Sequence, residues 1–385
     1  MKPLSSRLSK IPESAISEMN DLARLTKAIN LASGFPDFDP PEALIEAAVE
    51  ALRGGYNQYA TTAGVTTLRR AIAAKFTRFS GLEVDGDEEV TVTVGGSEAM
   101  FLVLAALCDP GDRVLIFSPF YENYAVDLHL LDAQPVYVNL APPEFQIDRQ
   151  ALRREFERGA KAIIVCNPSN PSGKVFSEEE LRYIGELVQE FDAYLITDEV
   201  YEHIVFPPHR HVYAAALPGM FERTITCSSL SKTYAITGWR LGTIIASDEI
   251  TAKIRTLHDY ITLGAAAPLQ RAAITALNFP DEYYQNLTRQ YGEMRDIFLG
   301  YLERSGIGYI PPQGTYFVLA DISPFGFEDD WAFCRWLAKE IGVAAVPGSS
   351  FFAEPVRHLI RLNFAKRPET LHQAGERLLR LREKL

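Results

Sequence analysis

The chain has 385 residues, of which 47% are hydrophobic, and it carries a formal net charge of −12 at pH 7. This length allows two or more domains, and an acidic chain without a basic run is unsuited to binding a nucleic-acid backbone. Its first residues lack the apolar stretch of a signal peptide, and no run approaches the roughly 18 apolar residues of a membrane span. We therefore expect neither nucleic acid nor a membrane as a partner.

The four cysteines indicate a reducing compartment. They show no metal-ligand spacing and lie mostly in apolar segments, at Cys108, Cys166, Cys227 and Cys334. Such cysteines are typical of reduced thiols in protein cores. We expect a cytoplasmic protein without a metal site.

Short apolar runs alternate with helical segments between about residues 91 and 247. The seven runs are 91–94, 113–117, 136–140, 162–166, 194–197, 224–227 and 241–246. Runs of this length are typical of strands buried on both faces of a mostly parallel sheet. We expect an α/β fold whose mostly parallel, seven-stranded sheet lies in a large domain over residues 41–280.

The remaining residues, 281–385 joined by 1–40, predict a smaller α+β domain. One long helix is predicted over 280–305, with Gly306 as its stop signal and an apolar stripe that packs into a core. The stripe consists of Tyr284, Leu287, Tyr291, Met294, Phe298 and Leu302. Strands predicted over 315–320 and 359–364 lie on either side of a helix over 329–341.

The first candidate for a ligand site is the glycine pair Gly95-Gly96, between the first predicted strand and an apolar helix that runs through Leu107. A glycine pair at a helix N-terminus leaves free backbone N–H groups at the positive end of the helix dipole, where an anion binds well. On its own, the pattern is also that of an ordinary turn between a strand and a helix.

A second candidate is the turn over 167–173, which follows the fourth predicted strand and contains two prolines and a glycine. These residues fix the backbone, so that Asn170 is held rigidly and its amide can donate a hydrogen bond to a ligand. Asparagine is also common in such turns for structural reasons alone.

The fifth predicted strand ends in two acids, Asp198 and Glu199, with Tyr201 close behind. Ligands of open α/β sheets bind at the carboxyl ends of the strands. Because side chains alternate along a strand, the two acids point in opposite directions, and we choose Asp198 as the acid of the site. The structural alternative is that Asp198 caps the next helix.

Lys232 follows three serines in the segment 228–232, and Arg240 comes shortly after it. A lysine can form an imine with an aldehyde cofactor if it can lose its proton nearby. Hydroxyls and a guanidinium at this spacing suit a phosphate dianion. The segment therefore points to pyridoxal phosphate, whose ring nitrogen needs a facing acid such as Asp198.

In this order, the motifs resemble the class I aminotransferases of the fold-type I pyridoxal phosphate superfamily. The resemblance runs from Gly34, in a Gly-Phe-Pro-Asp-Phe segment, to Arg361, which lies in an apolar run where a guanidinium needs an anionic partner. It implies a transaminase that binds pyridoxal 5′-phosphate. The amino group of an L-amino acid would pass to a 2-oxo acid through a Lys232 aldimine, in a ping-pong reaction.

The resemblance also implies a role for each site residue. Lys232 would move the proton between the substrate Cα and the cofactor C4′, and Asp198 would pair with the pyridinium nitrogen. Asn170 and Tyr201 would hydrogen-bond the phenolate oxygen of the cofactor. The other cofactor-binding residues would be Gly96, Ser97, Ser229 and Arg240 around the phosphate, Glu98 in the same turn, and Tyr121 stacked on the ring.

Two further roles concern substrate and assembly. Arg361 would clamp the substrate α-carboxylate with two hydrogen bonds, assisted by Asn170 and the backbone of Gly34. Tyr59 matches a tyrosine that reaches the phosphate of the neighbouring subunit, which implies a homodimer with shared active sites. The structural alternative is a loop tyrosine packed at the start of a helix predicted over 67–76.

Other activities are open on the same motifs. A carbon–sulfur lyase or a cyclopropane-forming synthase shares the fold, because the cofactor site alone does not determine the reaction. A ligand sensor of this fold usually carries a DNA-binding domain, for which the residues before position 30 leave no room. A nicotinamide dehydrogenase needs a Gly-x-Gly-x-x-Gly after a strand, which the sequence lacks. We predict a transaminase.

The amino donor is predicted from the residues that remain. A dicarboxylate donor needs a second cation, and the matched motifs leave none; Ser97 stands where some aspartate-type relatives carry lysine. Phe35, with Tyr121 and Tyr56 nearby, indicates an apolar or aromatic-lined pocket. This pattern resembles the kynurenine, glutamine and methionine aminotransferase branch, with aspartate aminotransferase as the alternative.

Overall fold

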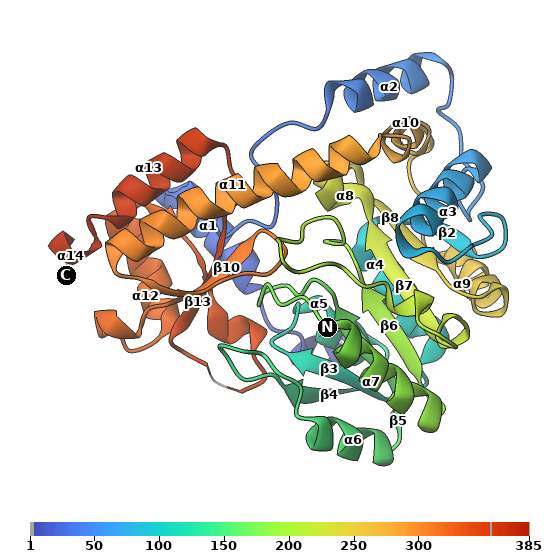
Figure 1. Ribbon diagram of the computed structural model, residues 1–385, viewed down its shortest axis with the longest axis horizontal. Helices are drawn as coiled ribbons and strands as arrows, with labels where there is room; N and C mark the ends of the chain where they lie inside the picture. The colour runs from blue at the N-terminus through green and yellow to red at the C-terminus, as the bar shows by residue number, and fades with distance from the viewer. Residues whose placement is uncertain (1–3, 355, 385) are drawn as a thin grey trace.

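The computed structural model describes residues 4–354 and 356–384 (Figure 1). Its largest sheet has seven strands in the order β2-β8-β7-β6-β5-β3-β4, and only β8 runs antiparallel to its neighbours. The strands are β2 (Val90–Val94), β3 (Arg113–Ser118), β4 (Gln134–Asn139), β5 (Ala160–Cys166), β6 (Tyr194–Asp198), β7 (Thr224–Ser229) and β8 (Leu241–Ile245). The predicted α/β fold is confirmed, and all seven predicted strands are present.

Both faces of this sheet are buried, because alternate side chains on each strand pack against different helices. On β5, Ile163 and Val165 share a core with α6 and α7, whereas Ile164 shares one with α4, α5 and α9. A third core packs α2, α3 and α10 against β2 and β8. The helices are α2 (Glu42–Arg53), α3 (Thr66–Ser80), α4 (Gly95–Leu107), α5 (Asn123–Leu130), α6 (Arg149–Glu157), α7 (Glu178–Glu190), α9 (Asp248–Ile261) and α10 (Ala267–Leu277).

One continuous helix, α11 (Asp281–Ser305), runs from α10 to the C-terminal part of the chain (Figure 1). It ends at Gly306, which adopts a left-handed conformation with φ of 76°. Its predicted apolar stripe is buried: Tyr284 packs in the core of α3 and α10, and the rest of the stripe packs in the C-terminal core. Within the described residues, no helix is long and apolar enough to cross a membrane.

A second, antiparallel sheet in the order β12-β13-β10-β9 lies in the C-terminal part. Its strands are β9 (Gly308–Ile310), β10 (Phe317–Asp321), β12 (Val346–Pro347) and β13 (Leu359–Asn363), and α12 (Asp330–Trp336), α13 (Pro368–Leu378) and α14 (Leu381–Lys384) accompany it. The helix predicted over 329–341 is α12 continued by a π-helical turn, Leu337–Ile341.

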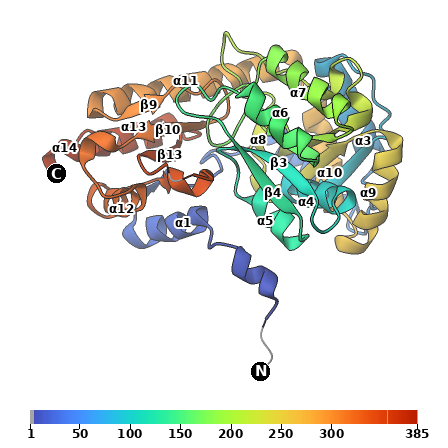
Figure 2. The same ribbon diagram turned by 90° about the horizontal axis from the view of Figure 1, so that it is seen from below.

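The N-terminal segment packs on this C-terminal part. β1 (Ile29–Asn30) pairs in parallel with β11 (Val343–Ala344), and α1 (Ala15–Thr26) contacts α12, beside which Figure 2 shows it. Met19 and Ala23 of α1 lie in the same apolar core as the α11 stripe. Residues that follow β1 are thereby carried toward the large sheet.

Candidate active site

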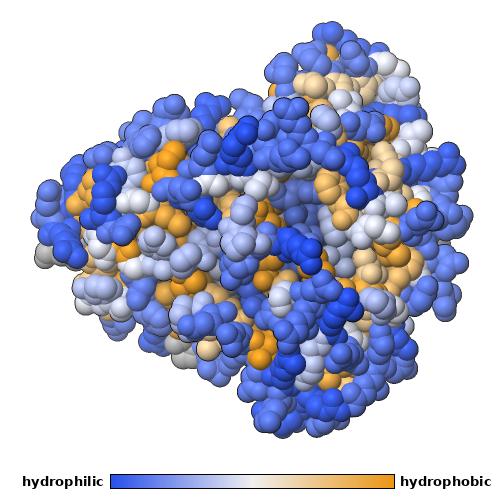
Figure 3. Space-filling model, viewed as in Figure 1, coloured by the Kyte–Doolittle hydropathy of each residue, from blue (hydrophilic) through white to orange (hydrophobic). Residues whose placement is uncertain are grey.

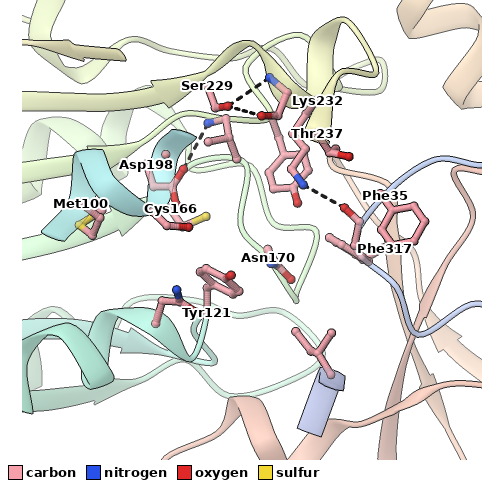
Figure 4. A pocket seen from close by; sticks show the side chains of 18 of the residues that line it. Phe35, Met100, Tyr121, Cys166, Asn170, Asp198, Ser229, Lys232, Thr237 and Phe317 are labelled. Carbon is pink, nitrogen blue, oxygen red and sulfur yellow. Dashed lines mark hydrogen bonds between the residues drawn. The ribbon is translucent and has the colours of Figure 1, made fainter. Parts of the chain in front are cut away.

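A pocket of about 330 Å³ lies where the carboxyl ends of β5, β6 and β7 face the segment after β1 and strand β13 (Figure 4). All of the predicted site residues line it except Glu98 and Tyr59. Those that do are Gly34, Gly96, Ser97, Tyr121, Asn170, Asp198, Tyr201, Ser229, Lys232, Arg240 and Arg361. Motifs from the whole length of the chain thus meet in one cavity.

Lys232 reaches this cavity from a short helix, α8 (Leu230–Thr233), at the end of β7. The Ser229 hydroxyl accepts a hydrogen bond from the backbone N–H of Ser231 at 3.1 Å and so caps that helix. Lys232 Nζ donates to the carbonyl oxygen of Gly34 at 2.9 Å. Burial, reinforced by the charge of Arg240, lowers the pKa of Lys232 to about 8. The amine can therefore lose its proton close to neutral pH.

Asp198 is the last residue of β6, and its carboxylate is held by two donors. Its Oδ2 accepts from Tyr124 Oη at 2.6 Å, and its Oδ1 accepts from the backbone N–H of Val200 at 3.3 Å. Burial raises the pKa of Asp198, and the Tyr124 bond opposes that rise. Glu199 lies on the other side of the strand, where it lines a separate cavity with Lys75, in agreement with the predicted alternation.

Tyr124 also lines the pocket, although it was not predicted as a site residue. It lies in α5, three residues after Tyr121, with only 2% of its surface exposed. Its position in an apolar helix is typical of an ordinary core aromatic. Only the three-dimensional contact with Asp198 distinguishes it.

Arg361 is buried at the centre of β13 and lies between two aromatic rings. Its guanidinium carbon is 4.2 Å from the ring centre of Phe317 and 4.6 Å from that of Phe351. Its Nη1 donates to Asn170 Oδ1 at 2.9 Å and its Nη2 to the carbonyl oxygen of Ala32 at 3.1 Å, while Nε has no partner among the described residues. Because both bonds go to neutral oxygens, this buried cation retains capacity for an anionic ligand.

The contact with Arg361 also orients Asn170. A guanidinium can only donate, so the amide oxygen of Asn170 must face it, and the amide NH₂ remains free to donate. Tyr201 also lines the pocket, and its ring is buried edge-on against Tyr316 with ring centres 5.3 Å apart. Lys232 Nζ is 5.9 Å from both of these rings. The Asn170 amide and the Tyr201 hydroxyl are thus two hydrogen-bond donors in the same pocket as Lys232.

The far end of the pocket suits an anion. Gly95 has a φ of 78°, which strains any other residue, and a Cβ at this position would push the guanidinium of Arg240 aside. Arg240 Nη1 donates to the carbonyl oxygen of Thr237 at 3.0 Å. Gly96 and Ser97 form the first turn of α4, whose backbone N–H groups have no partner within the helix. The Arg240 guanidinium and the N-terminus of α4 therefore lie in one pocket, and both favour a bound phosphate.

Glu98 does not line this pocket, although it lies in the same turn. Its carboxylate accepts hydrogen bonds from the backbone N–H of Val94 and from Thr262 Oγ1, and lies 3.4 Å from His258 Nε2. These contacts lower its pKa against the effect of burial. The Glu98 side chain connects the first turn of α4 to the end of α9. A direct contact between Glu98 and a cofactor stays a prediction.

Tyr59 lies outside the cavity, in the loop between α2 and α3, with 87% of its surface exposed. Its neighbours Leu52 and Tyr56 are about half exposed, and apolar residues reach the surface near α2 at the upper right of Figure 3. Tyr56 does not line the pocket of this chain, contrary to expectation, because its ring lies 4.5 Å from the Arg271 guanidinium.

The segment after β1 is fixed by side chains of the C-terminal part that the sequence analysis did not identify. Tyr316 Oη donates to the Gly34 carbonyl oxygen at 2.7 Å. Asn363 Nδ2 and Lys366 Nζ both donate to the Phe35 carbonyl oxygen, at 3.1 and 2.9 Å. Burial lowers the pKa of Lys366 to about 8. No local motif signals such contacts, because they join residues more than 280 positions apart.

The pocket also extends to α1. Ile16 and Asn20 of this helix line it together with Phe35, Tyr121 and Asn123. Phe35 and Tyr121 were predicted to line this part of the pocket, whereas Ile16 and Asn20 were not. Their signal is absent from the sequence because an isoleucine and an asparagine in a helix are ordinary.

The donor set fits pyridoxal phosphate. The cavity offers an amine of lowered pKa in Lys232, a buried carboxylate in Asp198 and an amide donor in Asn170, with an anion site at Arg240. A phosphorylated aldehyde with a basic ring nitrogen needs this combination of groups.

Comparisons with known proteins agree with this fit. The family model "aminotransferase class I and II" matches residues 26–378. The methionine aminotransferase of Escherichia coli is 39% identical over 98% of both chains, and its crystal structure has a TM-score of 0.95 over 99% of this chain and 100% of that one. A probable N-succinyldiaminopimelate aminotransferase of Mycobacterium tuberculosis is also 39% identical over 98% of both chains.

Human kynurenine–oxoglutarate transaminase 1 is 36% identical, over 97% of this chain and 96% of its own length. Matches of this extent cover both sheets and every motif of the pocket. The chain therefore belongs to the class I and II aminotransferases, which use pyridoxal phosphate to transfer amino groups between amino acids and 2-oxo acids.

Proposed function

We propose that this transaminase works with Lys232 as its reactive amine, Asp198 and Tyr201 as its other catalytic residues, and Arg361 as its carboxylate clamp. The cofactor, when bound, supplies an aldehyde for the lysine and an electron-withdrawing ring. Gly96, Ser97, Ser229 and Arg240 would hold its phosphate, and Tyr121 would stack on its ring. The convergence of these side chains in one cavity supports the assignment.

Each catalytic group has a physical reason for its task. Lys232, with a pKa lowered to about 8, can accept a proton from the substrate Cα at neutral pH and give it back. Asp198 would hold a proton on the ring nitrogen in a site that excludes water. Asn170 and Tyr201 would donate to the phenolate oxygen, and Arg361 would fix the α-carboxylate with two parallel hydrogen bonds.

The donor that we propose is a neutral L-amino acid with an apolar or aromatic side chain. The observation that carries this proposal is that the cations lining the pocket are Lys232, Arg240 and Arg361, each of which already has a role. The surface left for the donor side chain is formed by Ile16, Phe35 and polar uncharged groups. The relatives named for methionine and kynurenine transamination support the same class.

A panel of amino donors tests this proposal. Methionine, glutamine, kynurenine, phenylalanine and aspartate would each be paired with 2-oxoglutarate and compared by kcat/KM. We expect the neutral and aromatic donors to exceed aspartate by about a hundredfold, since a distal carboxylate buried without a cation costs several kcal/mol. Turnover without any 2-oxo acid would instead indicate a lyase, and a preference for aspartate would refute the proposed donor class.

We further propose a homodimer in which Tyr59 reaches the phosphate site of the other subunit. The exposure of Tyr59, Tyr260 and Leu263, at 87, 87 and 53%, supports this, because apolar surface of this kind is usually covered by a partner. Sedimentation of the holoenzyme measures the assembly. Mixing inactive Lys232→Ala with inactive Tyr59→Ala should restore part of the activity if sites are shared.

Two broader expectations stay proposals. The division into a large domain over 41–280 and a small domain of 1–40 with 281–385 is supported by the pairing of β1 with β11. A cytoplasmic location is supported by four unpaired cysteines, two of them buried and two half-buried. Limited proteolysis and cell fractionation would test them.

A further inference from the structure

We propose that Tyr124 is a positioning residue for Asp198: its hydroxyl holds one carboxylate oxygen in place so that the other lone pairs face the cofactor ring nitrogen. This inference rests on the role proposed above for Asp198. The hydrogen bond that carries it joins Tyr124 Oη to Asp198 Oδ2 at 2.6 Å, across 74 positions of sequence.

The ring of Tyr124 has little freedom to move. Only 2% of the residue is exposed, and the ring packs in the core between the sheet and helices α4, α5 and α9. Tyr121 meets it edge-on, with ring centres 5.8 Å apart. A hydroxyl at the end of a ring packed in this way has a fixed position, which makes it a suitable anchor for a carboxylate.

The strands beside Asp198 offer little else to hold it. Its partners in register are Cys166 on β5 and Cys227 on β7, and a thiol is a weak donor. Burial raises the pKa of both thiols, so they stay neutral. Among the described residues, the donors to the carboxylate are therefore the Tyr124 hydroxyl and the backbone N–H of Val200.

Charged groups on the surrounding elements act in opposite directions. Lys232 of α8 stabilises the Asp198 carboxylate, whereas Glu199, its neighbour behind the strand, destabilises it. Tyr124 itself stays protonated, because burial raises its pKa well above the ordinary value. A permanent neutral donor orients Asp198 without competing for the proton that the ring nitrogen must keep.

The test is a double-mutant cycle of Tyr124→Phe and Asp198→Asn in the full-length protein. The affinity of each apoenzyme for pyridoxal phosphate is measured by titration, kcat is measured over a pH range, and the melting temperature of each apoenzyme reports folding. Tyr301→Phe is the matched control, since it removes another tyrosine hydroxyl that donates to a carboxylate, Glu376 Oε1 at 3.1 Å, far from the pocket.

We expect Tyr124→Phe to weaken cofactor binding and to lower kcat, each by about tenfold, the size of one charge-assisted hydrogen bond. The acid limb of its kcat profile should move to higher pH, because Asp198 loses a donor that favours its carboxylate form. In the Asp198→Asn background, the same substitution should change either quantity by less than about twofold. Tyr301→Phe should leave both unchanged.

Equal effects of Tyr124→Phe in both backgrounds would overturn the inference, since the tyrosine would then act through packing. An unshifted acid limb would overturn it as well. The proposed function fails separately: if Asp198→Asn alone binds cofactor and turns over normally, then Asp198 has no role for Tyr124 to support.

Discussion

The pocket is built from two regions of different origin. One, the floor, consists of Asn170, Asp198, Ser229 and Lys232, which lie at or just after the carboxyl ends of three adjacent strands of the large sheet. The other, the wall, consists of Ile16, Asn20, Gly34, Phe35 and Arg361, supplied by the N-terminal segment and β13. The floor holds the groups assigned to the cofactor, and the wall holds the groups assigned to the substrate.

The two regions also differ in how they are held. The backbone of each floor residue is fixed by the strand or turn that carries it, as that of Ser229 is by β7, although distant partners such as Tyr124 also orient the side chains. Wall residues are fixed by contacts between distant segments, such as those of Asn363 and Lys366 with Phe35. The reactive groups are thus assigned to residues carried by the large sheet, and substrate selection to residues brought in by the N-terminal segment and β13.

Removal of the Lys232 amine from the floor should have the largest effect on turnover. Lys232→Ala should reduce turnover to background, because among the described residues no other amine lines the pocket to bond the cofactor or move the Cα proton. Borohydride treatment followed by peptide mass spectrometry should find cofactor attached to Lys232 in the wild-type chain alone. Attachment to the alanine variant at the wild-type level would remove Lys232 from its role.

Asp198→Ala should have the next largest effect on turnover. Without the carboxylate the ring nitrogen loses its proton, and we expect kcat to fall by three or more orders of magnitude, about 4 kcal/mol in barrier. Cofactor should still bind through Arg240 and the first turn of α4, which equilibrium dialysis would measure. A near-normal kcat would show that the floor does not need this acid.

The wall is tested by Arg361→Lys, which keeps the charge but loses the two parallel hydrogen bonds. We expect kcat/KM to fall by about a hundredfold for every amino donor alike, or about 3 kcal/mol. The absorbance of the bound cofactor should not change, since the floor is untouched. A loss confined to acidic donors would show instead that Arg361 contacts the donor side chain.

The smallest effect is expected at Lys366, which supports the wall from behind. Its pKa falls from 10.5 in the unfolded chain to about 8 in the fold, so between pH 8 and 10.5 the unfolded chain binds more protons. Wild-type stability should therefore rise with pH in this window, by at most about 3 kcal/mol relative to Lys366→Met. Urea unfolding of both apoenzymes at pH 7.5 and 10.5 measures this difference, and a constant difference would contradict it.

The same contrast explains what could be predicted from the sequence. The seven strands carry their own signal in short apolar runs, and Asn170, Asp198 and Lys232 lie in motifs a few residues long at strand ends. Arg361 was identified through the family resemblance, and its place in an apolar run, unusual for an arginine, supported the same role. Local patterns of this kind can be recognised in the sequence without any knowledge of the fold.

Other residues carry no such signal. Tyr124 is one buried aromatic among many, and Ile16 lies in a segment that joins the pocket through tertiary contacts, among them the pairing of β1 with β11, more than 300 positions away. Glu98 lies in a recognised motif, yet its side chain turns toward Thr262 and His258, which the spacing within the motif does not reveal. Contacts between distant segments decided each of these outcomes.

The origin of the wall has a consequence for protein engineering. Ile16, Asn20 and Phe35 all precede α2, whereas the first floor residue, Asn170, comes only after β5. A single cassette of the first 38 residues therefore supplies much of the donor-facing surface and can be exchanged without altering a reactive group. Transplanting that cassette between relatives named for different amino acids, at 36–39% identity, is the most direct route to a transaminase of new selectivity.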